Sequence, residues 1–178
     1  MLVESGEEPV ELGLYLSDAF DDKSLSFANL EHDWLRERFN PGFLGVESVF
    51  KLEGQLHMTG HFNSLGQLED AWFRYDGSID GARWPERIFV NTCGPDGDSI
   101  RAKERFGALL TALQNGTQVA LTHRLRVSDW AAAVLAKRYY HIGVDEEPSE
   151  VARRATRFVR RMFSHPAHWA GFEVISGL

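Results

Sequence analysis

The chain has 178 residues, of which 43% are hydrophobic and 25% are charged. These fractions are typical of a folded globular protein and exclude a disordered or fibrous chain. The length suits one domain, since domains commonly contain about 100–200 residues. No apolar run approaches the roughly 20 residues that span a bilayer, and the acidic first 22 residues do not resemble a secretory leader.

The single cysteine, Cys93, cannot form a disulfide within the chain. A chain without internal disulfides fits a reducing compartment, so we expect a cytoplasmic protein that does not bind membranes.

Charge divides the chain into an acidic half and a basic half. Residues 1–98 carry 7 basic and 19 acidic side chains, and residues 99–178 carry 12 basic and 7 acidic ones. The two formal charges, −12 and +5, add to the net charge of −7. Such a division either lets the halves pack through complementary surfaces or reserves a basic face for an anionic partner.

The N-terminal part is predicted to contain an acidic arm and one helix. Residues 1–22 form the arm, with one short strand over residues 12–16. Ser24 is expected to cap a helix that ends near Phe39, because Asn40-Pro41-Gly42 follows. The expected apolar stripe of this helix consists of Phe27, Leu30, Trp34 and Leu35.

A β-rich block with one inserted helix is predicted over residues 46–127. Apolar and polar residues alternate with period two in several short runs, and turn residues separate the runs. The expected strands are residues 46–53, 55–63, 68–76, 87–93 and 118–127. This pattern predicts an antiparallel β-meander, interrupted by a helix that ends at Asn115-Gly116.

The basic C-terminal part, residues 128–178, is predicted to be mainly helical. Ser128 or Asp129 can cap a helix that ends near His141, and a second helix is expected over residues 149–164. A short final strand can follow at residues 172–176. The whole chain, residues 1–178, is therefore expected to form a single α+β domain, with the meander packed against N-terminal and C-terminal helices.

The helix predicted over residues 149–164 carries the sharpest functional signal. At 100° per residue, five arginines fall within an arc of roughly 120°, opposite an apolar face. They are Arg153, Arg154, Arg157, Arg160 and Arg161. Arginine binds phosphates and carboxylates through paired hydrogen bonds, so this face is expected to contact nucleic acid or an acidic protein. A solvated face, or one docked on the acidic half, is the alternative.

The histidines give weaker signals. His57 and His61 would lie roughly 13 Å apart in a strand, too far to share one zinc ion, so we expect two exposed histidines and no metal. His123 falls on the apolar face of its strand, which predicts a buried, hydrogen-bonded imidazole. No nucleotide-binding loop or recognised catalytic motif occurs, and no cofactor is expected.

One stretch resembles a known family. Ala82-Arg83-Trp84-Pro85-Glu86-Arg87-Ile88-Phe89-Val90 is followed by the helix ending at Asn115-Gly116, a strand, and Trp130. This order, over about residues 82–130, resembles the strand–helix–strand portion of bacterial single-stranded DNA-binding proteins with the OB fold. The resemblance implies an OB-like barrel, in which Trp84 and Trp130 would contact bases and Arg124 and Arg126 would lie near the strand path.

We therefore expect a non-enzymatic binding protein that contacts single-stranded nucleic acid, or a protein of a nucleic-acid-handling complex. Trp72 and Arg74, on one face of their predicted strand, would extend the platform. The predicted site comprises Trp72, Arg74, Trp84, Arg124, Arg126, Trp130 and the five arginines named above.

Two other functions stay open. The acidic half could serve a protein-interaction or inhibitor factor, for example a mimic of nucleic acid, which would require Asp21, Asp22 and Glu31 to be exposed. A metal- or histidine-dependent enzyme would instead use His57, His61 or His123.

Overall fold

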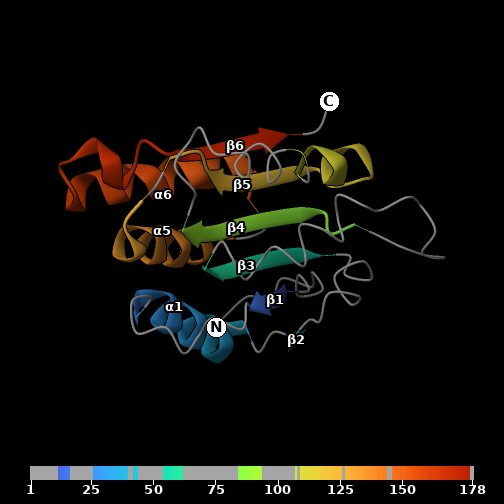
Figure 1. The fold of residues 1–178 in the computed structure, drawn as a ribbon, viewed down its shortest axis with the longest axis horizontal. Helices are drawn as coiled ribbons and strands as arrows, with labels where there is room; N and C mark the ends of the chain where they lie inside the picture. The colour runs from blue at the N-terminus through green and yellow to red at the C-terminus, as the bar shows by residue number, and fades with distance from the viewer. Residues whose placement is uncertain are drawn as a thin grey trace, which may run out of the picture.

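A computed structural model describes residues 12–16, 26–39, 42–43, 54–61, 84–93, 107, 109–125, 127–143 and 146–176. These residues form one six-stranded sheet and a layer of helices (Figure 1). The strands are β1 (Leu12–Leu16), β2 (Gly42–Phe43), β3 (Gln55–His61), β4 (Arg87–Cys93), β5 (Val119–His123) and β6 (Phe172–Ser176). The labelled helices are α1 (Ser26–Phe39), α5 (Asp129–Ile142), α6 (Pro148–Met162) and the short 3-10 helix η4 (Pro166–His168). Residues 109–114 are also helical and end at the turn Asn115-Gly116, as predicted.

The sheet is mixed, and its strands follow the order β2-β1-β3-β4-β5-β6. β1 to β5 pair in parallel with their neighbours, and only β6 runs antiparallel to β5. In the parallel register Phe89 of β4 pairs with His57 of β3 and with Leu121 of β5. Because paired residues of neighbouring strands place their side chains on the same face of a sheet, these three side chains point to one face.

The prediction that helices combine with a β-sheet in an α+β fold is confirmed, but the antiparallel meander is wrong. The runs at 55–61 and 87–93 are parallel neighbours, and residues 62–86 connect them. The sheet is open, with β2 and β6 at its two edges among the described residues, so an OB-like barrel is not supported. All five residues of β5 are buried, as expected for a parallel strand covered on both faces.

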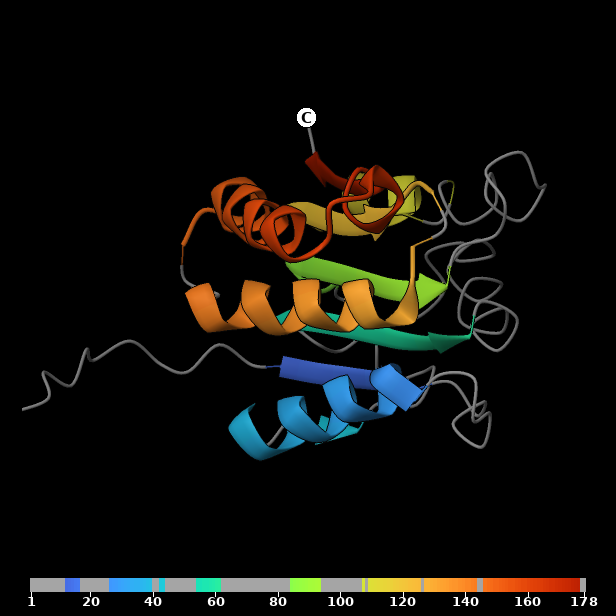
Figure 2. The same ribbon diagram turned by 90° about the vertical axis from the view of Figure 1, so that its left-hand side faces the viewer.

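Helices α1, α5 and α6 lie side by side on one face of the sheet (Figure 2). α5 occupies the centre of this layer, since it packs against both α1 and α6. Ser128 caps α5, where its hydroxyl accepts a hydrogen bond from Ala131 N, and Gly143 ends the helix with φ at +137°. That backbone conformation suits glycine, because a side chain there would be strained.

The main core lies between this helix layer and the middle of the sheet. Phe89 and Leu121 of the sheet pack with Leu135 and Tyr139 of α5 and with Val151 of α6. The apolar stripe of α6 is therefore turned inward, which leaves the opposite side of the helix for the arginines.

Several predicted boundaries are confirmed, while the predicted apolar face of α1 is confirmed only for Leu35, which is buried, and Trp34, which is partly buried against the core. β1, β4 and β6 coincide with the strands expected at residues 12–16, 87–93 and 172–176. In α1, however, Leu30 is 62% exposed and Phe27 is also exposed, whereas Glu31 is buried. The buried face follows Ala28, Glu31 and Leu35 instead, because Glu31 bonds to groups of the sheet.

The described part of the chain contains no helix that combines the length and the apolarity required to cross a membrane.

Candidate functional site

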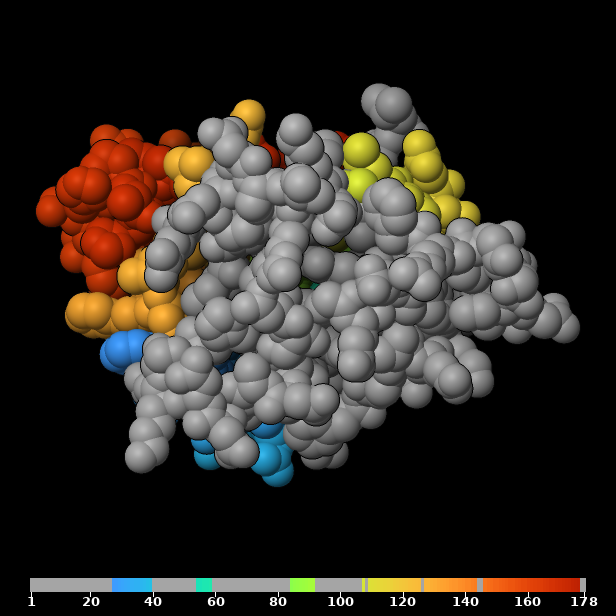
Figure 3. Space-filling view, in the orientation of Figure 1, coloured from blue at the N-terminus to red at the C-terminus, as the bar shows by residue number. Residues whose placement is uncertain are grey.

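The arginine surface of α6 consists of Arg153, Arg154, Arg157, Arg160 and Arg161, and all five side chains are exposed. α6 begins at Pro148, and the carboxylate of Glu147 caps it by accepting hydrogen bonds from Ser149 N and Glu150 N. Val151, Ala155 and Val159 form its buried side. Figure 3 shows α6 and the segment after it as an exposed surface at one end of the molecule.

Two of the five arginines are neutralised locally. Arg153 pairs with Glu150 one turn earlier, and the Arg154 guanidinium donates to the Glu146 carboxylate. The hydrogen bond from Arg153 holds the pKa of Glu150 below its ordinary value. Within the described ranges, Arg157, Arg160 and Arg161 form no ion pair with a carboxylate. Three exposed guanidiniums thus retain their full charge on one helix face.

Arg160 also connects the arginine surface to an aromatic ring. Its guanidinium lies over the indole of Trp169, with Cζ 5.0 Å from the ring centroid. Trp169 follows η4, which brings the chain back under the C-terminal half of α6. This cation–π contact holds the guanidinium in one place without neutralising its charge.

A second group of rings, the aromatic cluster, lies at the C-terminal end of α6. Trp130 is 50% exposed and contacts Phe27 at 5.8 Å and Phe163 at 4.9 Å between centroids. Phe163 in turn contacts His168, which neighbours His165. We define the cluster as Phe27, Trp130, Phe163, His165 and His168.

Hydrogen bonds from three elements position this cluster. Phe27 N donates to Asp129 Oδ2 at 2.9 Å, which ties the start of α1 to the start of α5. Burial raises the pKa of the Asp129 carboxyl. The Ser128 hydroxyl lies 3.1 Å from His168 Nδ1, which ties η4 to the same helix end.

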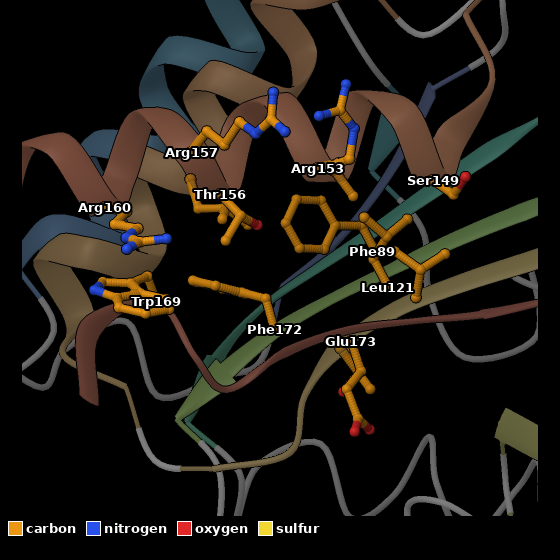
Figure 4. A pocket seen from close by; sticks show the side chains of 14 residues that line it. Phe89, Leu121, Ser149, Arg153, Thr156, Arg157, Arg160, Trp169, Phe172 and Glu173 are labelled. Atoms are coloured by element: carbon orange, nitrogen blue, oxygen red, sulfur yellow. The ribbon is translucent and has the colours of Figure 1, made fainter. Parts of the chain in front are cut away.

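A pocket of about 280 Å³ lies between α6 and the edge of the sheet formed by β5 and β6. Its floor is apolar and includes Phe89, Leu121 and Phe172, while Arg157 and Arg160 stand on its α6 side (Figure 4). Glu173 points away from the pocket in that view, and its carboxylate accepts a hydrogen bond from Arg124. The pocket therefore combines an apolar interior with positive charge beside it.

The structure brings only part of the predicted site together. The five arginines share one exposed surface. Trp130 contacts Phe163, which directly follows the C-terminal end of α6. Trp84 is only 7% exposed, so its ring offers no face for a base. Arg124 is exposed and paired with Glu173 at the end of β5. Trp72, Arg74 and Arg126 lie outside the described residues.

The interior contains a chain of hydrogen bonds that the sequence did not reveal. Glu31 accepts from His57 Nε2 at 2.6 Å and from Asn91 Nδ2 at 2.5 Å. Nδ1 of His57 lies 3.0 Å from the Tyr140 hydroxyl. Asn91 Oδ1 accepts a hydrogen bond from His123 Nε2 at 2.6 Å. Burial raises the pKa of Tyr140 well above its ordinary value, so this hydroxyl stays protonated and can donate to His57.

This buried chain corrects one prediction about the histidines and confirms another. His57 is fully buried and not on an exposed polar face, because its imidazole forms a hydrogen bond with the buried carboxylate of Glu31. His123 is buried and hydrogen-bonded, as its place on an apolar face predicted. Glu31 is interior, so it is not a surface acid for a protein partner. The side chain of His61 lies outside the described set.

The sequence did not identify Trp169 as a site residue, nor Phe27, Phe163, His165 and His168 of the aromatic cluster. It also did not reveal that Glu31 is buried in the interior. Nothing local distinguishes Trp169, since its role depends on the return of the chain beneath Arg160. Glu31 did carry a signal, because it lies three residues after Ala28 and four before Leu35, on one helix face. An acid at such a position predicts a buried hydrogen-bonding partner.

No family model matches this chain, and no curated protein is detectably similar to it in sequence. In the part of the chain that the structure describes, no group of three His, Cys, Asp or Glu side chains could hold a metal ion. The candidate site is therefore argued from the chemistry and the arrangement of its own residues.

Proposed function

We propose that this chain is a non-enzymatic binding protein that contacts single-stranded nucleic acid through the arginine surface of α6 and the aromatic cluster. The observation that carries the proposal is a set of three exposed arginines that pair with no carboxylate of the described residues: Arg157, Arg160 and Arg161. Phosphates neutralise such a row and release counterions as they bind.

The aromatic cluster favours single-stranded over duplex nucleic acid. Bases of a single strand are free to stack on exposed rings, whereas the bases of a duplex are already stacked on one another. The half-exposed ring of Trp130 supports this choice, because it packs against Phe27 and Phe163 and still presents half of its surface to solvent.

Because the protein carries a net charge of −7, a polyanionic partner is expected to bind only at this positively charged surface. A polyanion is repelled by most of an acidic protein and attracted only where positive charge is concentrated. Binding should therefore be local to α6 and should weaken as salt screens the arginines.

We assign the buried chain around Glu31 to the fold and not to chemistry. Its members on α1, β3, β4, β5 and α5 are each at most 5% exposed. A network whose hydrogen bonds are satisfied fixes the arrangement of the elements that contribute to it. A histidine-dependent enzyme would need one of these imidazoles to reach a substrate.

Fluorescence anisotropy of a labelled oligodeoxythymidine of about ten nucleotides tests the proposal at low and at near-physiological salt. The wild-type protein should bind at low salt and weaken as salt rises. The double variant Arg157→Ala/Arg160→Ala should lose most of this affinity. Arg36→Ala/Arg38→Ala changes the net charge equally on exposed positions of α1 and is the matched control.

Absence of wild-type binding at low salt would overturn the proposal. Equal weakening by both double variants would also do so, because net charge alone would then account for the affinity. In either case an acidic protein would become the first partner to test against α6.

A further inference from the structure

The pocket beneath α6 is large enough for one small group and is built mainly from apolar side chains. Its volume is about 280 Å³, near the lower end of pockets that hold small ligands, roughly 300–1,000 Å³. Phe89 and Leu121 on the sheet and Leu135 on α5 supply the buried lining. An occupant must therefore have a compact apolar body.

Positive charge beside the pocket selects an occupant that carries negative charge. Arg157 and Arg160 are one turn apart on α6, and neither is paired with a carboxylate among the described residues. The nearest acid of the lining, Glu173, points away and pairs with Arg124 (Figure 4). The charges are thus complementary to an anion whose apolar part enters the pocket.

Aromatic rings on the pocket wall favour a flat occupant. Trp169 lies at one end beneath the Arg160 guanidinium, and the rings of Phe172 and Phe89 line the space beside it (Figure 4). The side chain of Thr156, the residue before Arg157 in α6, adds a hydroxyl to the wall. Flat faces with one hydrogen-bonding group suit a nucleobase, which stacks on rings and has a polar edge.

We infer that this pocket accepts one nucleobase of the bound strand, while Arg157 and Arg160 contact the phosphates on either side of that nucleotide. The inference rests on the proposed function, since it names the subsite where the strand is anchored. The arginine surface supplies affinity for any phosphate chain, and the pocket requires that a base be present.

A pocket-filling variant and an abasic strand separate the two contributions. Thr156→Phe places a ring in the pocket from a half-buried position on α6, and Leu110→Phe adds a ring at an exposed position outside both the pocket lining and the arginine surface. Each protein is titrated by anisotropy with oligodeoxythymidine and with an abasic oligomer of the same length. Circular dichroism melting establishes that both variants are folded.

Thr156→Phe should weaken binding of oligodeoxythymidine at least tenfold and change binding of the abasic oligomer less than twofold. Leu110→Phe should change neither. The inference fails if Thr156→Phe leaves the affinity for oligodeoxythymidine unchanged, or if it weakens both oligomers equally. If the wild type binds neither oligomer, the proposed function itself fails.

A second measurement does not depend on the folding of Thr156→Phe. Oligodeoxythymidine should quench the fluorescence of the wild-type protein more than the abasic oligomer does, because a base would stack beside Trp169. This difference should become smaller in Trp169→Phe, where only stacking on Trp130 remains to cause it. Equal quenching by the two oligomers in the wild type would overturn the inference.

Discussion

The Arg160 guanidinium lies over the indole ring of Trp169, with 5.0 Å between Cζ and the ring centroid. This contact joins two regions that are separate in sequence, the exposed face of α6 and the segment that returns after η4. It places a charged group and an aromatic group beside the same pocket. Polyanion binding and base stacking therefore share one location in the proposed function.

The first prediction concerns the salt dependence of strand binding. Each phosphate neutralised on a single strand contributes about 0.7 to the slope of log affinity against log salt. Arg157→Ala/Arg160→Ala removes two proposed phosphate contacts, so the slope should become shallower by about 1.4. Anisotropy titrations at several salt concentrations measure it.

The control for this slope is Arg36→Ala/Arg38→Ala on α1, which should leave it unchanged. A slope identical in the wild type and in Arg157→Ala/Arg160→Ala would contradict the assignment of these two arginines to phosphates.

The second prediction concerns Trp130. Stacking of a base on an aromatic ring contributes about 1–3 kcal/mol, so Trp130→Ala should weaken strand binding by roughly 5- to 150-fold. Trp130→Phe keeps a ring in contact distance of Phe27 and Phe163 and should retain most of the affinity. Anisotropy titrations of the two variants provide the comparison, and equal affinities for both would exclude stacking at this position.

The third prediction concerns stability of the fold. Glu31→Ala leaves the donors of His57 and Asn91 buried without their acceptor. A buried donor left without its acceptor commonly costs about 1–3 kcal/mol in the free energy of unfolding, and this substitution leaves two. Urea denaturation should show a loss of this size.

Glu37→Ala is the matched control, since Glu37 is an exposed acid on the same helix. Its effect should stay within about 0.5 kcal/mol. If the two substitutions had equal effects, the buried chain would have no special role in stability.

The fourth prediction concerns acidification and the start of α6. Hydrogen bonds from Ser149 and from Glu150 N lower the pKa of Glu147 below its ordinary value of 4.5. Because the folded pKa is depressed, the stabilisation by this cap is present above pH 4.5 and is lost as the pH falls through the folded value.

The amide chemical shifts of Ser149 and Glu150 should report this titration, with a midpoint below 4.5. In Glu147→Gln the same amides should show no such step. A midpoint at or above 4.5 in the wild type would contradict the capping role.

Local signals predicted the elements well and their arrangement poorly. The bounds of β1, β4 and β6 follow from short runs of strand-forming residues, and Ser128 and Gly143 mark the ends of α5. Whether two strands pair in parallel depends on how the chain between them returns. The alternation in residues 55–61 carries no information on that point.

The same distinction applies to the candidate site. The arginine surface could be predicted because helical spacing alone places the five arginines of α6 on the side opposite its buried residues. Trp169 beneath Arg160, and His57 beside Glu31, are contacts between residues distant in sequence. Such contacts depend on the tertiary fold, so no local pattern specified them.

The most direct test of the central claim is a map of amide chemical-shift changes in the isotope-labelled protein as oligodeoxythymidine is added at low salt. If α6 binds single strands, saturable changes should occur in α6, around residues 153–162, and in the segment from His165 to Phe172. The amides of the exposed face of α1, around Arg36 and Arg38, should not move. An absence of saturable shifts, or shifts confined to α1, would contradict the account.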